Sequence, residues 1–117
     1  MYCMLSCFNL NSDTTKDDFL LARNAFFAHL NSLDLIDSIG PLCERDRDTP
    51  MDTDDRLQQF YYLSYFVDKA QCDRSYQYIL QHQGVKHPLH AAVLSKTCDE
   101  VFICYAELPD IKKSDSF

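Results

Sequence analysis

The stretch FYYLSYFV, residues 60–67, decides the fold of this chain. Every residue in it except Ser64 is aromatic or aliphatic, which is the composition that strands favour. Side chains alternate between the two faces of a strand. One face of this strand carries Tyr61, Leu63, Tyr65 and Val67, and the opposite face carries Phe60, Tyr62 and Phe66. The sequence therefore predicts a strand that is bulky and apolar on both faces.

The segments before this strand predict two more strands and a helix. Residues Tyr2–Leu10 form a short apolar run that ends in polar turn residues, which is typical of a strand. Apolar residues then recur at helical spacing through Thr14–Leu33, so this range predicts an amphipathic helix. Leu35–Glu44 predicts a strand that Gly40 and Pro41 interrupt. Because proline has no N–H for a central ladder, this strand belongs at the edge of the sheet.

The segments after the aromatic strand predict a second helix and two further strands. Asp68 is a good N-cap for a helix that runs to about His82. The buried side of that helix is expected to consist of Cys72, Tyr76, Ile79 and Leu80. A glycine and a proline end the helix, and the apolar runs Leu89–Ser95 and Val101–Glu107 are then both predicted as strands.

This order of elements predicts a ferredoxin-like α+β fold, β-α-β-β-α-β with an extra C-terminal strand. The sheet is antiparallel and has two helices on one face. We expect a single domain over residues 1–108 and a flexible tail over 109–117. No helix remains for the other face, yet its residues are apolar, and soluble monomers rarely expose a large apolar patch. A second copy is the simplest cover, so we expect a homodimer.

Composition narrows the function classes. The 117 residues carry a net charge of −7, which repels phosphate backbones and anionic lipids, so no nucleic-acid or membrane partner is expected. Two glycines are too few for a P-loop or a dinucleotide-binding fingerprint. The six cysteines include no CxxC pair, and the N-terminus lacks the basic region of a signal peptide. We therefore expect free thiols in a cytoplasmic protein.

The element order, the length and the two-faced sheet make residues 1–107 similar to the dimeric α+β barrel superfamily, and within it to an uncharacterised bacterial family. That superfamily includes cofactor-free monooxygenases, stress-responsive barrel proteins and haem-degrading enzymes. The resemblance implies that two sheets face each other across a dimer and enclose a pocket in each protomer. Haem-degrading members generally have a tryptophan in that pocket, and this chain has none, so no cofactor is expected.

Five residues are candidate ligand contacts, namely Arg23, Arg45, Tyr62, Tyr65 and His90. The two tyrosines belong to the aromatic strand, Arg23 lies inside an apolar helix stripe, and His90 starts a predicted strand. In an apolar pocket, a few polar groups of this kind fix the orientation of a small molecule. The same aromatic side chains could equally fill the core of a dimer, so both interpretations stay open.

Arg45 belongs to the most polar stretch, Glu44–Arg56, which has no periodic apolar face and is predicted as a loop. Its acidic residues lack the glycine and the spacing of an EF-hand, so no metal site is expected. The loop is either a lid over the mouth of the barrel or a solvated connection.

No catalytic motif is visible, so the catalytic residues stay unknown and the question of whether the chain is an enzyme stays open. The sequence favours a small cytosolic homodimeric barrel protein that binds a small apolar or aromatic ligand between the sheets. The alternative is a cofactor-independent, monooxygenase-like barrel enzyme.

Overall fold

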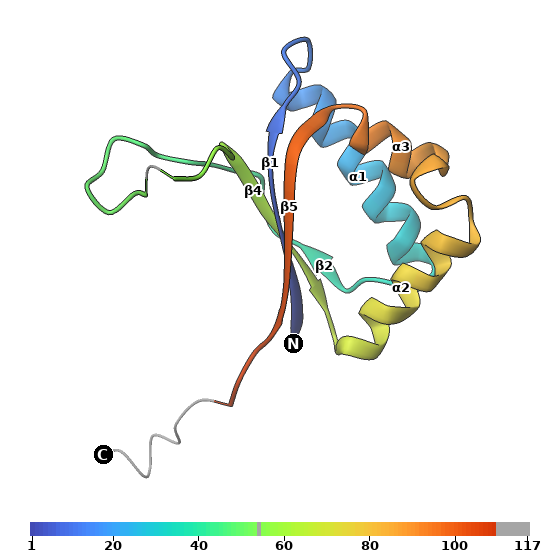
Figure 1. The fold of residues 1–117 in the computed structure, drawn as a ribbon. Helices are drawn as coiled ribbons and strands as arrows, with labels where there is room; N and C mark the ends of the chain where they lie inside the picture. The colour runs from blue at the N-terminus through green and yellow to red at the C-terminus, as the bar shows by residue number, and fades with distance from the viewer. Residues whose placement is uncertain (54, 110–117) are drawn as a thin grey trace, which may run out of the picture.

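The computed structural model describes residues 1–53 and 55–109, and Figure 1 shows them as a sheet with helices on one side. The sheet is antiparallel with the strand order β2-β4-β1-β5, and β3 also pairs with β4. Its strands are β1 (Tyr2–Leu10), β2 (Ser38–Ile39), β3 (Cys43–Glu44), β4 (Phe60–Phe66) and β5 (Thr97–Ala106). The ferredoxin-like α+β class predicted from the sequence is confirmed.

The helices of the described part begin where the sequence supplies a cap. They are α1 (Lys16–Ser32), α2 (Lys69–Gln81), a short 3-10 helix η1 (Gly84–Lys86) and α3 (Pro88–Leu94). At the start of α1, the Thr15 hydroxyl accepts a hydrogen bond from the Asp18 N–H at 3.1 Å. At the start of α2, the Asp68 carboxylate accepts one from the Gln71 N–H at 2.9 Å. Each bond satisfies a backbone donor that the helix itself leaves unpaired.

The predicted strand over Leu89–Ser95 is wrong, because this segment forms helix α3. Pro88 occupies the first turn, where its missing N–H removes no helical bond, and the His87 side chain caps the helix. The periodicity of a short apolar run cannot distinguish a strand from a buried helix. The chain thus has a third helix in place of a further strand. The sheet still has five strands because the edge strand is divided into β2 and β3 around Gly40 and Pro41.

The predicted buried stripe of α2 is wrong in part. Tyr76 and Leu80 are 60% and 52% exposed, whereas the polar residue Gln71 is buried. Gln71 turns inward because its amide bonds the backbone on both sides: Oε1 accepts from the Val67 N–H at 2.8 Å and Nε2 donates to the Asp34 carbonyl at 3.3 Å. At this position, hydrogen bonds to buried backbone groups stabilise the fold more than an apolar side chain of the helical pattern would.

The core lies between the sheet and the helices, in two clusters. One cluster joins Leu30, Leu35, Ile36 and Phe66, and the other joins Phe8, Phe19 and Val93. Phe19 of α1 is fully buried, and the centroid of its ring is 4.8 Å from that of Phe8 on β1. Burying one such side chain contributes about 2 kcal/mol to the free energy of unfolding. These contacts hold α1 and α3 against the central strands.

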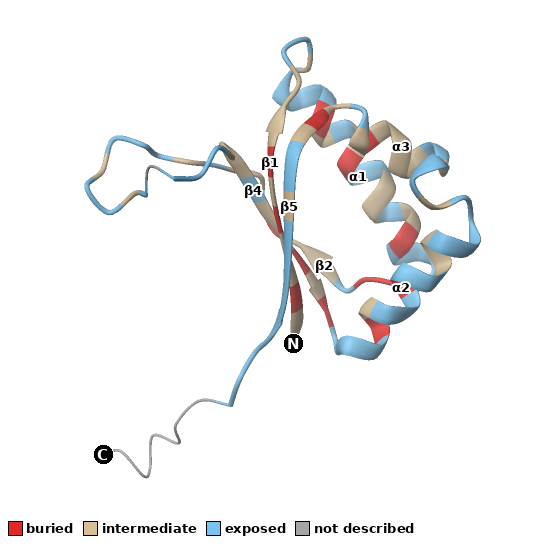
Figure 2. Cartoon of the chain, viewed as in Figure 1, coloured by how far each residue is buried: buried red, intermediate tan, exposed pale blue. Residues whose placement is uncertain are grey.

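The face of the sheet that points away from the helices, here called the outer face, is apolar as predicted. It consists of Cys3, Leu5 and Cys7 on β1, Tyr61, Leu63 and Tyr65 on β4, and Val101, Ile103 and Tyr105 on β5. Tyr61, Ile103 and Tyr105 are 40%, 50% and 41% exposed. Figure 2 shows that none of the helices covers this side. The described chain therefore leaves a continuous apolar sheet surface in contact with solvent.

The connection from β3 to β4 has no helix or strand in its described residues, as predicted for Glu44–Arg56. It projects from the sheet on the side opposite the helices (Figure 1). The predicted tail covers residues 109–117, and residues 110–117 of it lie outside the described part. Within the described residues, no helix is both long enough and apolar enough to span a membrane.

Candidate ligand-binding site

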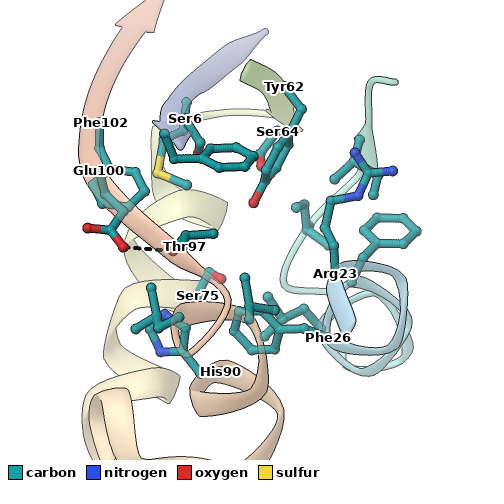
Figure 3. A pocket seen from close by; sticks show the side chains of 18 of the residues that line it. Ser6, Arg23, Phe26, Tyr62, Ser64, Ser75, His90, Thr97, Glu100 and Phe102 are labelled. Atoms are coloured by element: carbon teal, nitrogen blue, oxygen red, sulfur yellow. Dashed lines mark hydrogen bonds between the residues drawn. The ribbon is translucent and has the colours of Figure 1, made fainter. Parts of the chain in front are cut away.

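A cavity of about 140 Å³ lies between the helix-covered face of the sheet and helices α1, α2 and α3. Its wall is mostly aromatic and aliphatic, with contributions from Phe8, Phe19, Phe26, Leu30, Val93 and Phe102. A small set of polar side chains interrupts this wall, among them Ser6, Arg23, Tyr62 and His90 (Figure 3). An apolar chamber with few polar groups is the usual construction of a small-molecule site.

Ser6 and Tyr62 form the polar corner of the cavity. They are direct partners across β1 and β4, so both side chains point to the helix side of the sheet. Ser6 is 2% exposed, and its Oγ has no hydrogen-bond partner among the described residues. The Tyr62 hydroxyl points into the space between sheet and helices (Figure 3). Burial raises the pKa of Tyr62, so this hydroxyl keeps its proton and can donate as well as accept.

Arg23 holds Tyr62 in place from α1. Its guanidinium carbon lies 5.0 Å from the centroid of the Tyr62 ring, which is a cation–π distance. The guanidinium donates to the Gly40 carbonyl at 3.1 Å and to the Asn24 amide oxygen at 3.2 and 3.1 Å. Arg23 is 8% exposed, and this burial lowers the pKa of its guanidinium. The residue therefore ties α1 to the edge of the sheet and fixes the ring that carries the cavity hydroxyl.

His90 lies on the α3 side of the cavity, away from Ser6 and Tyr62 (Figure 3). It was expected to start a strand, but it belongs to α3. Its ring stacks on Phe26, with centroids 5.0 Å apart and an interplanar angle of 14°. Its Nδ1 lies 3.4 Å from the Gly84 carbonyl oxygen. Burial lowers the pKa of His90, so its imidazole stays neutral down to a lower pH than usual.

The structure brings Arg23, Tyr62 and His90 to one cavity but separates the other two candidates from it. Tyr65 lies on the outer face, opposite Cys3 and Ser38. The cavity is also in a different place from the one expected. It lies between the sheet and the helices of one protomer, and not on the sheet face that a second copy would cover.

Arg45 organises the loop between β3 and β4. Its guanidinium pairs with the Asp52 carboxylate at 2.8 Å, and the two side chains are 13% and 16% exposed. It also donates to the Arg56 carbonyl at 2.7 Å and to the Thr53 carbonyl. Hydrogen bonding from Arg45 lowers the pKa of Asp52. These contacts give Arg45 a structural role at a second hollow of about 330 Å³, which lies over the outer face beside Tyr61.

Sequence reasoning missed Ser6, although the chain carries a signal for it. Ser6 stands between Met4 and Phe8 on the helix-facing side of β1, so it is a polar residue at a core position. Such a residue needs a partner, and the search for partners leads to the cavity. Within the described residues, no three side chains of His, Cys, Asp or Glu come together in a way that could hold a metal ion.

Solved structures with this fold come from a plant and from bacteria. The Arabidopsis thaliana protein At3g17210 superposes with a TM-score of 0.66 at 9% identity, covering 96% of this chain and 100% of that chain. A solution structure of the same protein gives a TM-score of 0.56 at 10% identity, with 95% and 91% covered. A dimeric ferredoxin-like protein of unknown function from Thermobifida fusca gives a TM-score of 0.52 at 14% identity, with 91% and 90% covered.

No family model and no curated protein sequence matches this chain. At identities this low, the structural likenesses speak to the fold and not to the activity. They agree with the ferredoxin-like fold described above. The chain therefore has a ferredoxin-like α+β fold, as the Thermobifida fusca protein does.

Proposed function

We propose that this protein is a homodimeric small-molecule-binding protein, in which each protomer holds a mainly apolar ligand between its sheet and its helices. The observation that carries the proposal is Ser6, whose buried hydroxyl faces the cavity beside the Tyr62 hydroxyl and makes no hydrogen bond of ordinary geometry among the described residues. A buried polar group without a hydrogen bond costs about 1–3 kcal/mol. A ligand that presents an oxygen atom to Ser6 removes this cost when it binds.

The size of the cavity limits the ligand. An apolar cavity of roughly 150 Å³ holds one benzene ring, and the cavity here is about 140 Å³. Ser6 and the Tyr62 hydroxyl lie on the same wall, so one ligand oxygen can reach both. The chemistry of the wall therefore favours a single-ring molecule, or an aliphatic one of similar volume, that carries a carbonyl or hydroxyl group.

The entrance of the cavity lies at β5. Phe102 lines the cavity and is nevertheless 55% exposed, and Glu100 on the same strand is also exposed. β5 is the last strand in the order of the sheet, so no further strand closes this side within the described residues. A ligand enters past Phe102, whose side chain is free to turn because so much of it contacts solvent.

The outer face supports pairing with a second copy. Its nine strand residues are apolar or aromatic, and Ile103 and Tyr105 stay 50% and 41% exposed in the described chain. Sheets that pack face to face place their inner faces about 10 Å apart, so a second sheet would bury both surfaces at once. The Thermobifida fusca protein with this fold is a dimer, which is the assembly that our proposal assigns to this chain.

A cytoplasmic location is part of the proposal. All six cysteines are free thiols, as expected for a protein of a reducing compartment. Burial raises the pKa of Cys72 to about 11, so this thiol stays protonated and unreactive near neutral pH. Fractionation of cells that express the tagged full chain tests the location, and recovery in a membrane or extracellular fraction would contradict it.

Two test ligands of nearly the same shape show whether the polar group of a ligand is recognised, or whether the cavity only takes up apolar molecules. Acetophenone presents a carbonyl oxygen, and ethylbenzene has nearly the same shape without it. Titration of the ¹⁵N-labelled protein, followed by backbone amide shifts, should show saturable binding of acetophenone at the cavity and weaker binding of ethylbenzene. In Ser6→Ala the preference for acetophenone should fall. Absence of saturable shifts with both compounds, or an unchanged preference in Ser6→Ala, would overturn the proposed site.

A further inference from the structure

All four histidines of the chain lie where the three α-helices meet. The Tyr78 hydroxyl on α2 is 2.7 Å from the Nε2 atom of His29 on α1, and the Tyr78 ring stacks on His82 with centroids 4.1 Å apart. The rings of His29 and His87 have centroids 5.4 Å apart. His90 stacks on Phe26, and Phe26 lines the cavity. The cluster therefore joins the helix layer to the cavity wall.

His87 has a specific structural task, because it is the N-cap of α3. Its Nδ1 atom accepts a hydrogen bond from the Leu89 N–H at 3.2 Å. A ring nitrogen accepts only when it carries no proton, so the cap requires neutral imidazole. Protonation at Nδ1 replaces the acceptor with a donor that faces the Leu89 N–H. It also places a positive charge at the positive end of the helix dipole.

Helix α3 depends on this cap more than α1 and α2 depend on theirs. It has seven residues, and a helix of that length is not stable without tertiary contacts and satisfied ends. Val93 in its last turn packs into the core cluster with Phe8 and Phe19, while His90 and Val93 form part of the cavity wall. Loosening of α3 therefore opens the cavity on the side away from Ser6.

The groups that face His87 do not compensate a positive charge. They are Phe26 and His29 on α1, Tyr78 on α2 and His90 on α3, and Lys86 precedes His87 in the chain. Among the described residues, no Asp or Glu oxygen lies within 4.0 Å of a histidine nitrogen. A positive charge on His87 therefore has no nearby counter-ion, and the lowered pKa of His90 comes from burial and in part from its proximity to His87.

We propose that the histidine cluster is an acid-sensitive latch on the cavity, in which protonation of His87 uncaps α3 and opens the cavity wall. Release of a bound ligand then follows, and this last step rests on the proposed function. The latch itself is a property of the fold and does not require a ligand.

The direction of the pH effect follows from the cap at His87 and from the buried ring of His90. Closed α3 requires a neutral His87 and keeps the pKa of His90 below its ordinary value, because burial disfavours the charged ring. Opened α3 exposes the His90 ring, which then takes up a proton at an ordinary pKa of about 6.5. Since the open state binds more protons, the closed state loses stability as the pH falls through about 6.5 and below.

Hydrogen exchange at α3 tests the latch in the full chain without a ligand. The Ala91 N–H reports on closure, because it donates to the His87 carbonyl at 2.7 Å inside the first turn. Its protection factor, corrected for the intrinsic effect of pH, should fall at least about fivefold between pH 7.5 and 5.5. His87→Asn keeps a side-chain acceptor that does not titrate, so its protection factor should stay nearly constant.

Two further variants make the test specific. His87→Ala should show the low protection of the acid form at both pH values, because it has no cap at all. His82→Asn removes a histidine of the same cluster from α2 and should respond to pH as the unchanged protein does. A pH response in His87→Asn equal to that of the unchanged protein, or a constant protection factor in the unchanged protein, would overturn the latch.

Acetophenone affinity at the two pH values separates the latch from the proposed function. If the latch and the ligand site are both correct, the dissociation constant rises at least about fivefold at pH 5.5, and only in proteins that keep His87. If acetophenone binds equally at both pH values, the latch is overturned and the ligand site stands. If it binds at neither pH value while Ala91 protection changes as expected, the latch stands and the ligand site is overturned.

Discussion

Ser6 on β1 and Tyr62 on β4 are cross-strand partners, and both side chains line one wall of the cavity drawn in Figure 3. The Tyr62 ring is fixed by Arg23, whereas the Ser6 hydroxyl has no partner among the described residues. A buried hydroxyl without a hydrogen bond lowers the stability of the ligand-free protein. A ligand oxygen that bonds to it removes this loss of stability and favours binding.

Ser6→Ala should raise the free energy of unfolding by about 1 kcal/mol, or leave it unchanged, because it removes a buried hydroxyl that makes no bond. Most substitutions at buried positions have the opposite effect. Urea unfolding followed by circular dichroism measures the change. A loss of more than about 1 kcal/mol would mean that Ser6 has a partner in the free protein, and the argument for the ligand would fail.

Arg23→Lys should lower the free energy of unfolding by about 1–2 kcal/mol, although it keeps the charge. Lysine cannot reproduce the planar fork that bonds Gly40 and Asn24 and stacks on the ring of Tyr62. Asn24→Ala is the matched control, since it removes one acceptor and leaves the ring contact intact. If the lysine variant is as stable as the unchanged protein, the fork contributes nothing.

Ile103→Glu should convert the homodimer into a monomer that keeps its fold. Ile103 lies near the centre of the outer face and is 50% exposed in a single chain, so its replacement leaves the protomer core unaffected. In a dimer it would place two carboxylates in an apolar interface. Light scattering after size exclusion measures the mass. Leu21→Glu, at a residue that is 72% exposed on α1, is the control and should stay dimeric.

Asp52→Asn should make the loop between β3 and β4 more sensitive to trypsin, because it removes the charged partner of Arg45. The same pair should weaken at low pH. The pKa of Asp52 lies below its usual value through hydrogen bonding from Arg45, so its contribution is complete above the ordinary carboxyl range and disappears as the pH falls through the lowered pKa. Cleavage after Arg47 and Arg56, compared with an Asp48→Asn control, measures the effect. Equal cleavage rates in the two variants would contradict it.

The sequence predicts the sheet better than it predicts the helix layer. The strand in residues 60–67 and the edge strand broken at Gly40 and Pro41 were recognised because β-forming composition and proline act locally. Helix α3 was not recognised, because a short apolar run has no distinguishing period and its cap is a histidine, which is outside the usual set of capping residues.

The candidate site could be predicted only in part. Arg23 and Tyr62 stood out as a charge on an apolar helix face and a hydroxyl on an apolar strand, and the structure places them together. Tyr65 could not be separated from Tyr62, because the sequence does not say which face of a two-faced strand the helices cover. The gathering of four histidines depends on how three helices pack, which no local pattern encodes.

The two edges of the sheet differ in their capacity for polymerisation. On one side, β2 and β3 have two residues each and are separated by Pro41, which offers no donor to an incoming chain. On the other side, β5 is ten residues long and pairs only with β1 among the described strands. Fibre-like growth by strand addition can therefore begin at β5 alone. The acidic pair Asp99 and Glu100 near the start of that strand provides charge repulsion against such growth.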